Sequence, residues 1–238
     1  MSVHRLRRGL ARAWAWTSGD PGRPAAAVVQ GTLLPGEPHV FGDDPAAIAA
    51  LLREVPGWEC VNAPLAVAEA LAAIIERDTG RPCLRGPEIY FVQDAPPPED
   101  AGDGDGDGGA VVRRLLPADL PLLEAATEPL AMRGWRFGTA ERLLAEGVAA
   151  GAVAGGELAA AAFTSALGER FAEVGVVTRE DSRNRGLATA AAAIVCRALR
   201  ERGLAPVWST AEDNHASLRV AARLGFRETS RRVYLCRG

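Results

Sequence analysis

The stretch VGVVTREDSRNRGLATAAAAIVCRALRERG, residues 174–203, decides the fold class. It begins as a β-branched run, crosses a polar segment and ends as an alanine-rich run of helical spacing that Gly203 terminates. We therefore expect a strand, a short loop and then a helix from Gly186 to about Arg202. Together with the further strands and helices described below, this unit indicates a mixed α/β protein.

Two arginines, Arg183 and Arg185, stand immediately before the expected helix. The free N–H groups of a first helical turn already make that end positive, so cations there are unfavourable unless an anion binds. A phosphate would receive hydrogen bonds from those N–H groups and from the arginines, and the small residues Gly186 and Ala188 leave room for its approach. The sequence predicts a phosphate or diphosphate site at residues 183–189, with unliganded surface arginines as the alternative.

The overall composition is that of a globular protein, with 238 residues of which 48% are hydrophobic and 24% charged. The formal net charge is −3, so no overall field attracts the chain to nucleic acid or to an anionic membrane. No run reaches the ~20 apolar residues that a membrane-spanning helix needs. Cys60, Cys83, Cys196 and Cys236 form no CxxC pair and no histidine stands at ligand spacing, so we expect reduced thiols, no metal and a cytoplasmic protein.

A segment rich in proline, glycine and acidic residues divides the chain at residues 94–109, and we expect a flexible linker there. It separates a smaller supporting α/β lobe, residues 1–93, from a larger domain, residues 110–238. Within the linker, the residues Asp103, Asp105, Asp107 and Gly108 match the opening of a calcium-binding EF-hand loop. The twelfth position of that loop requires glutamate and is Arg114 here, which argues against calcium.

The first lobe contains recognisable element signals but no cluster of catalytic residue types. We expect a docked amphipathic helix over residues 1–16, with a targeting or membrane-surface segment as the alternative. We also expect two strands around a Pro-Gly turn within residues 25–42, helices over 44–55 and 63–80, and a strand over 87–93.

The larger domain alternates strands with helices. We expect strands over residues 110–116, 151–156, 157–166, 169–178, 206–210 and 231–237, and helices over 117–126, 139–147, 186–202 and 214–224. Gly155 and Gly156 predict a tight hairpin turn between the second and third of these strands. Antiparallel runs broken by crossover helices indicate a mixed, mostly antiparallel sheet flanked by helices.

Two segments carry a family resemblance. The run RNRGLA resembles the R/Q-x-x-G-x-G/A signature of the GNAT superfamily of N-acetyltransferases, with Arg183, Gly186 and Ala188 at its defining positions. The segment WSTAEDNHASLRVAARLGF, residues 208–226, is similar to the part of that family that follows the signature, including the pair Asn214 and Ser217. The two-lobed layout resembles the glycine N-acyltransferase-like branch.

The resemblance implies that acetyl-CoA is the co-substrate and how it lies. Its pantetheine arm enters a gap where the strand ending at Thr178 splays from the strand PVWST, and its diphosphate binds at residues 183–189. Asn214 is expected to hydrogen-bond the arm, and capping of its own helix is a compatible role. The cofactor-binding residues implied in this way are Val176, Val177, Thr178, Arg183, Asn184, Arg185, Gly186, Leu187, Ala188, Thr189, Asn214 and Ser217.

The catalytic residues are predicted on the same basis. An acceptor amine must lose a proton before it attacks, and Glu173 stands on the strand where the family often carries the base; a charged residue on the solvent side is the alternative. Many members carry a tyrosine four residues before the glycine of LGF, but this position is Ala221. Ser217 is then the candidate donor to the sulfur or a plain cofactor contact, and Tyr234 is a more distant candidate.

The function expected from these residues is transfer of an acetyl group from acetyl-CoA to an amine of a small molecule or a protein, by a monomer or homodimer. Met132, Arg133, Trp135 and Phe137 are candidates for the acceptor pocket, although an aromatic loop packed on the core explains them equally well. Two other readings stay open: an acetyl-CoA sensor without turnover, and a module that binds another phosphorylated ligand.

Overall fold

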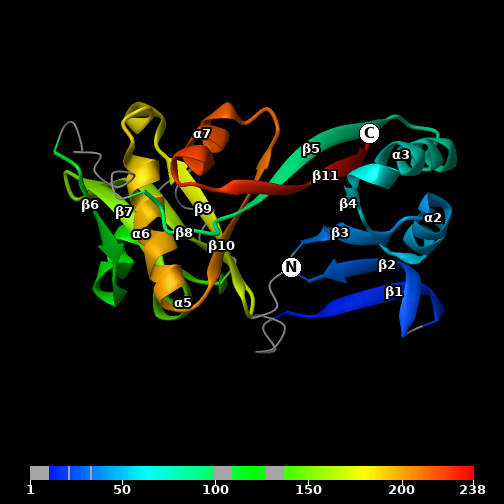
Figure 1. Cartoon of the computed structure of the whole chain (residues 1–238), viewed down its shortest axis with the longest axis horizontal. Coiled ribbons are helices and arrows are strands. Elements are labelled where there is room, and N and C mark those ends of the chain that lie inside the picture. Colours follow the sequence, from blue (N-terminus) through cyan, green and yellow to red (C-terminus); the bar gives the residue numbers. More distant parts are fainter. Residues whose placement is uncertain (1–10, 21, 33, 99–108, 127–136) are drawn as a thin grey trace.

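The computed structural model describes residues 11–20, 22–32, 34–98, 109–126 and 137–238, and all structural statements concern these residues. They form one mixed sheet of eleven strands in the order β1-β2-β3-β4-β11-β5-β10-β9-β8-β7-β6. Figure 1 shows two groups of helices and strands joined by the long strands β5 and β11. The predicted fold class, a mostly antiparallel mixed sheet flanked by helices, is confirmed.

The first group of elements builds its own hydrophobic core. Asp44 caps α2 by accepting from the backbone N–H groups of the first turn, and Gly80 ends α3 in the left-handed conformation, as the sequence predicted. Ile48 and Leu71 are fully buried where the two helices pack on the sheet. The elements are β1 (Ala13–Asp20), β2 (Arg23–Gly31), β3 (Leu34–Gly42), α2 (Pro45–Glu54), β4 (Cys60–Pro64) and α3 (Leu65–Thr79).

Two expectations for this part of the chain were wrong. Residues 13–16 begin strand β1 and are not helical, because the alternating sequence AWAW pairs with β2 across the sheet; residues 1–10 lie outside the described part. The Pro35–Gly36 pair lies inside β3 and not at the turn, which falls between Gly31 and Leu34. Strand β4 was not predicted.

The second group of elements follows the predicted order closely. Helix α6 packs against β7, β8 and β9, and its alanines let the helix approach the sheet within a core that includes Val174 and Trp208. Gly155 and Gly156 both have positive φ at the β7–β8 turn, as expected. The elements are β6 (Val111–Leu115), η2 (Pro117–Asp119), α4 (Leu120–Glu124), α5 (Ala140–Glu146), β7 (Ala149–Ala154), β8 (Glu157–Leu167), β9 (Phe171–Thr178), η4 (Glu180–Ser182), α6 (Leu187–Glu201), β10 (Ala205–Ala211) and α7 (His215–Arg223).

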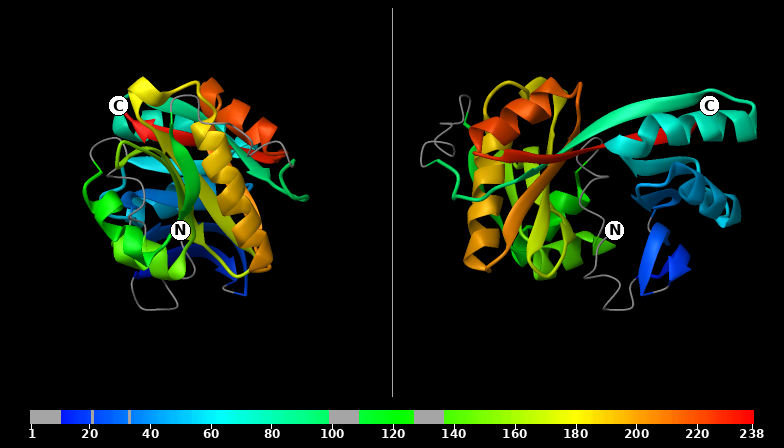
Figure 2. Two further views of the ribbon diagram at one scale, coloured as in Figure 1. Left: turned by 90° about the vertical axis from the view of Figure 1, so that its left-hand side faces the viewer. Right: turned by 45° about the vertical axis from the view of Figure 1, so that its right-hand side comes forward.

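Strands β5 (Cys83–Val92) and β11 (Arg227–Arg237) connect the two groups (Figures 1 and 2). β11 pairs with β5 along its whole length and with β4 over its last part, where Val233 and Leu235 enter the first core. β5 also pairs with β10 in the second group. Each part of the chain therefore contributes one strand to the other group: β5 pairs with β10, and β11 pairs with β4. The division of the chain at residues 94–109 stays a prediction.

The cysteines differ from the expectation of four reduced thiols. Cys60 on β4 and Cys236 on β11 are register partners and form a disulfide, so for this pair the expectation was wrong. The cause is a tertiary pairing 176 residues apart in sequence. Cys83 and Cys196 are free and buried. None of the described helices is both long and apolar enough to cross a membrane.

Candidate active site

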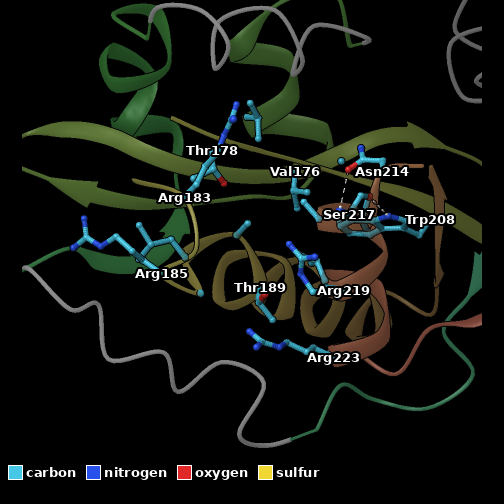
Figure 3. Close-up of a pocket in the computed structure, with 18 of the residues that line it drawn as sticks. Val176, Thr178, Arg183, Arg185, Thr189, Trp208, Asn214, Ser217, Arg219 and Arg223 are labelled. Carbon is cyan, nitrogen blue, oxygen red and sulfur yellow. Dashed lines mark hydrogen bonds between the residues drawn. The ribbon is translucent and has the colours of Figure 1, made fainter. Parts of the chain in front are cut away.

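The cleft lies where β9 and β10 separate. These parallel neighbours are in register only from Phe171 to Glu173 against Ala205 to Val207, and beyond this point they diverge as predicted. A cleft of about 790 Å³ opens there, between the two strands, the start of α6 and one side of α7 (Figure 3). All twelve residues predicted to bind the cofactor line this cleft, together with Glu173.

The start of α6 offers unpaired backbone donors to the cleft. Gly186 is the N-cap with φ 74°, no side chain caps the helix and its first turn holds no acidic residue. The N–H of Ala190 makes the first helical hydrogen bond, to the carbonyl of Gly186, so the N–H groups of residues 187–189 have no backbone acceptor in the described part of the chain. A Cβ at Gly186 would meet nothing within 4 Å, so crowding by the protein does not require glycine here. The positive φ of residue 186 does.

Among the described residues, four arginines and one carboxylate are the charged groups that line the cleft. Arg183 and Arg185 come from the loop before α6. Arg219 and Arg223 come from α7 and were not predicted, although their spacing of four residues places them on one helix face. Figure 3 shows both beside Thr189 at the start of α6. Neither side chain makes a hydrogen bond or ion pair with a described residue.

Glu173 lies at the end of the cleft where the strands still pair. Its two carboxylate oxygens accept hydrogen bonds from Ser165 at 2.7 Å and from Ser209 at 2.9 Å. Ser165 is the extra residue of a register shift in β8, between Thr164 and Ala166, and this bulge directs its hydroxyl at β9. The sequence indicated Glu173 but not the two serines, because the contacts join three different strands.

A second group of polar side chains lies across the cleft at the start of α7. The side-chain oxygen of Asn214 accepts from the N–H of Ser217 at 3.1 Å, so Asn214 caps this helix as expected. The Ser217 hydroxyl oxygen accepts from the indole N–H of Trp208 at 2.9 Å. Trp208 is 2% exposed and is a core residue, and it also forms part of the cleft wall.

The other candidates lie elsewhere. Ala221 is fully buried in the core, so this position presents no group to the cleft. Tyr234 pairs with residues of β4 and β5 and is not among the cleft residues. Phe137 is buried in a core cluster, in agreement with the packing alternative, and the other three acceptor-pocket candidates lie outside the described residues.

No group of three or more histidine, cysteine or acidic residues among the described ones is placed to hold a metal ion. The four residues that match the opening of a calcium loop, at positions 103, 105, 107 and 108, lie outside that part of the chain.

Residues 126–234 match the family model described as GNAT acetyltransferase. Over this stretch the chain is similar to the GNAT acetyltransferases. No curated protein matches the chain. Among solved structures, a GCN5-related N-acetyltransferase-like protein from Streptococcus suis is similar over 94% of this chain and 88% of its own, with a TM-score of 0.69 and 20% identity.

Two further structures share the fold. A GCN5-related N-acetyltransferase from Kribbella flavida covers 99% of this chain and 92% of its own, with a TM-score of 0.59 and 17% identity. A tandem GNAT protein from the clavulanic acid biosynthesis pathway covers 94% and 82%, with a TM-score of 0.56 and 18% identity. At these identities the structural likenesses establish the GNAT fold, and together with the family match they indicate an acetyltransferase.

Proposed function

We propose that the protein transfers an acetyl group from acetyl-CoA directly to an amine of a small molecule or a protein, in a complex that holds both substrates. One observation carries this proposal. The diverging edges of β9 and β10 and the uncapped start of α6 open into the same cleft. A pantetheine arm needs the first feature, and a diphosphate needs the second.

The described residues fit acetyl-CoA in both respects. We expect the pantetheine arm to pair with free backbone groups of residues 176–178, much as an added strand would. The diphosphate would accept from the unpaired N–H groups of residues 187–189 and from Arg183 and Arg185. Asn214 lies at the opposite wall, where it would contact the arm.

Arg219 and Arg223 on α7 add a second positive wall. Coenzyme A carries a 3′-phosphate besides its diphosphate, and two cations whose side chains have no partner among the described residues suit that additional charge. The described lining of the cleft has four arginines against one glutamate, and this balance favours a polyanionic ligand.

The reaction itself needs a base and close positioning. Holding the amine against the thioester supplies much of the rate, and the ammonium form of the acceptor must first lose a proton. Glu173 is expected to accept that proton directly or through water. Ser165 and Ser209 orient the carboxylate by one hydrogen bond to each of its oxygens.

Isothermal titration calorimetry with acetyl-CoA, acetyl-dephospho-CoA and ADP tests the donor site. Acetyl-CoA should bind most tightly, and the double variant Arg219→Gln/Arg223→Gln should lose the preference over the dephospho form. Arg142→Gln, an exposed arginine on α5 outside the cleft, is the matched control. Equal binding of acetyl-CoA and ADP would instead favour a module for another phosphorylated ligand.

Turnover is tested by coenzyme A thiol release over a panel of small amines and peptides. Glu173→Gln should abolish most of the release from the responsive acceptor while acetyl-CoA still binds. Absence of turnover with every acceptor, alongside tight acetyl-CoA binding, would favour the sensor reading.

A further inference from the structure

Gly175 on β9 is a glycine for a different reason from Gly186. A Cβ at Gly175 would lie 2.9 Å from Cε2 of Phe163 and 3.3 Å from its Cζ, which is closer than packed carbon atoms approach. Gly175 does not have a positive φ, so this contact, and not backbone conformation, requires the missing side chain. The edge of the Phe163 ring therefore lies over β9 at residue 175, where a side chain would otherwise stand.

The Phe163 ring is held in this place by the sheet and by the core behind it. Phe163 on β8 is the register partner of Gly175, so the two residues share one face of the sheet. Its side chain is 4% exposed and belongs to a buried cluster that includes Leu143 and Val177. Phe163 also lines the cleft. A ring that is nearly buried and still lines the cleft presents a small, fixed part of its surface to a ligand, because its packed neighbours resist displacement.

The inference drawn from this ring rests on the proposed function, which gives the donor a direction in the cleft. The diphosphate is expected at residues 187–189, the pantetheine arm along residues 176–178, and the base is Glu173. The thioester then lies between the arm and Glu173, because the amine that loses its proton there attacks the thioester carbon. This direction brings the acyl group beside Val174 and Gly175.

The described walls of the cleft leave little room beyond that point. In the plane of the sheet, β9 and β10 pair from Glu173 back to Phe171, which closes the gap between them. On one face of the sheet, Trp208 is 2% exposed and packs on Phe226 with ring centroids 5.5 Å apart. On the other face stands the edge of Phe163. An acetyl group is short enough to end here, whereas each additional methylene meets an aromatic wall.

We propose that Phe163 determines the specificity for the donor, because its ring edge over Gly175 excludes acyl groups longer than acetyl. The donors that fit are short-chain acyl-CoA thioesters, and medium-chain and aromatic acyl groups are rejected. Phe163 makes no hydrogen bond through its side chain, so a substitution there changes the shape of the wall and no polar contact. The limit can therefore be moved without altering the groups expected to bind the diphosphate or the pantetheine arm.

Isothermal titration calorimetry with coenzyme A, acetyl-CoA and hexanoyl-CoA measures this limit without an acceptor substrate. Wild-type protein should bind hexanoyl-CoA at least about tenfold more weakly than acetyl-CoA, because extra methylenes forced into a packed site displace its walls. Phe163→Leu removes the ring edge and should bring the two affinities to within about twofold, because the added methylenes then fill the space that the ring leaves. Phe163→Met, a flexible side chain, should give the same change and replaces the leucine variant if that variant does not fold.

Phe137→Leu is the matched control for this measurement. Phe137 is 3% exposed in the same buried cluster but is not among the described cleft residues. Its replacement should lower the stability of the protein and leave the preference for acetyl-CoA unchanged.

Urea denaturation of the ligand-free protein tests the contact between Phe163 and Gly175 by itself. Gly175→Ala should destabilise the protein, because its Cβ would meet the ring. Adding Phe163→Leu should relieve part of this loss, because the crowded ring atoms are gone. Additive effects of the two substitutions would overturn the contact on which the inference depends.

The calorimetric outcomes separate this inference from the proposed function. If coenzyme A and acetyl-CoA do not bind, the proposed function fails and this inference fails with it. If wild-type protein binds acetyl-CoA and hexanoyl-CoA equally well, the limit on the acyl group is overturned and the proposed function stands. If wild-type protein prefers acetyl-CoA and Phe163→Leu keeps the whole preference, another wall sets the limit and the role of Phe163 is overturned.

Discussion

Substitution of Gly186 separates two reasons for glycine at the start of α6. The first is backbone conformation, since φ is 74° and a residue with a Cβ costs about 1–2 kcal/mol in that region. No steric cost within the protein adds to this, because a Cβ there would meet nothing within 4 Å. Gly186→Ala should therefore lower the free energy of unfolding by about 1 kcal/mol, and Gly186→Val by more because valine is β-branched.

Gly186→Asn should be the mildest of the three changes. Asparagine tolerates positive φ, and in the same loop Asn184 adopts φ 61°. Urea denaturation of the ligand-free variants measures the order expected from backbone conformation, which is asparagine, then alanine, then valine. Gly80→Ala is the control, since Gly80 has φ 68°, equally open surroundings and a place at the end of α3 away from the cleft.

The second reason is the approach of the diphosphate, which calorimetry with acetyl-CoA tests separately. A side chain at position 186 would enter the space in front of the N–H groups of residues 187–189. All three Gly186 variants should then bind acetyl-CoA at least about tenfold more weakly, whatever their stability, because each obstructs charge-assisted hydrogen bonds. Wild-type affinity in Gly186→Asn would refute the placement of the diphosphate at α6, and equal destabilisation by asparagine and valine would refute the backbone argument.

Three further predictions concern catalysis and stability. Glu173→Gln should lower kcat at least ~100-fold in the thiol-release assay while calorimetry shows an unchanged Kd for acetyl-CoA; a small loss of kcat would exclude Glu173 as the base. The Arg113 guanidinium lowers the pKa of Asp119 to about 2, so the pair stabilises the fold above the unfolded pKa near 4 and this contribution is lost as pH falls toward 2. Asp119→Asn should lower the unfolding free energy by about 1–2 kcal/mol at pH 7, a figure reduced for solvent screening because Arg113 is partly exposed. The loss should be smaller at pH 2.5. An equal loss at both pH values would contradict the ion pair as its cause. Thiol titration of the unfolded, unreduced chain should find two free thiols, and four would contradict the disulfide between Cys60 and Cys236. Reduction of this disulfide should lower the unfolding free energy by about 2–5 kcal/mol.

Local signals made much of the fold predictable. The glycines at 186 and 203 mark where α6 starts and where the chain leaves it, and the Gly155–Gly156 pair fixes a hairpin, because each position needs a backbone conformation that few other residues adopt. Helix caps such as Asp44 act over two or three residues and are visible in the same way. The twelve residues expected to bind the cofactor line one cleft for a similar reason, since most of them lie in one continuous segment.

The features that the sequence did not predict depend on contacts between distant parts of the chain. The pairing of Cys60 with Cys236 depends on β11 crossing into the first group of strands, which no local pattern indicates. Ser165 and Ser209 look like ordinary strand residues until three strands bring them to Glu173. At the N-terminus, the period-two pattern of AWAW was hidden by the helical spacing expected before it.

Strand β5 explains how β9 and β10 can separate without leaving β10 unsupported. β10 is in register with β9 over only three residues but with β5 from Val207 to Ala211, over the same part that diverges from β9. The backbone groups on one side of β10 are therefore satisfied by β5, which keeps Trp208 and Ser209 in fixed positions at the edge of the cleft. The groups on its other side stay open toward the cleft. A strand from the first part of the chain thus stabilises the edge that the pantetheine arm is expected to meet, which gives the supporting lobe a structural part in the proposed reaction.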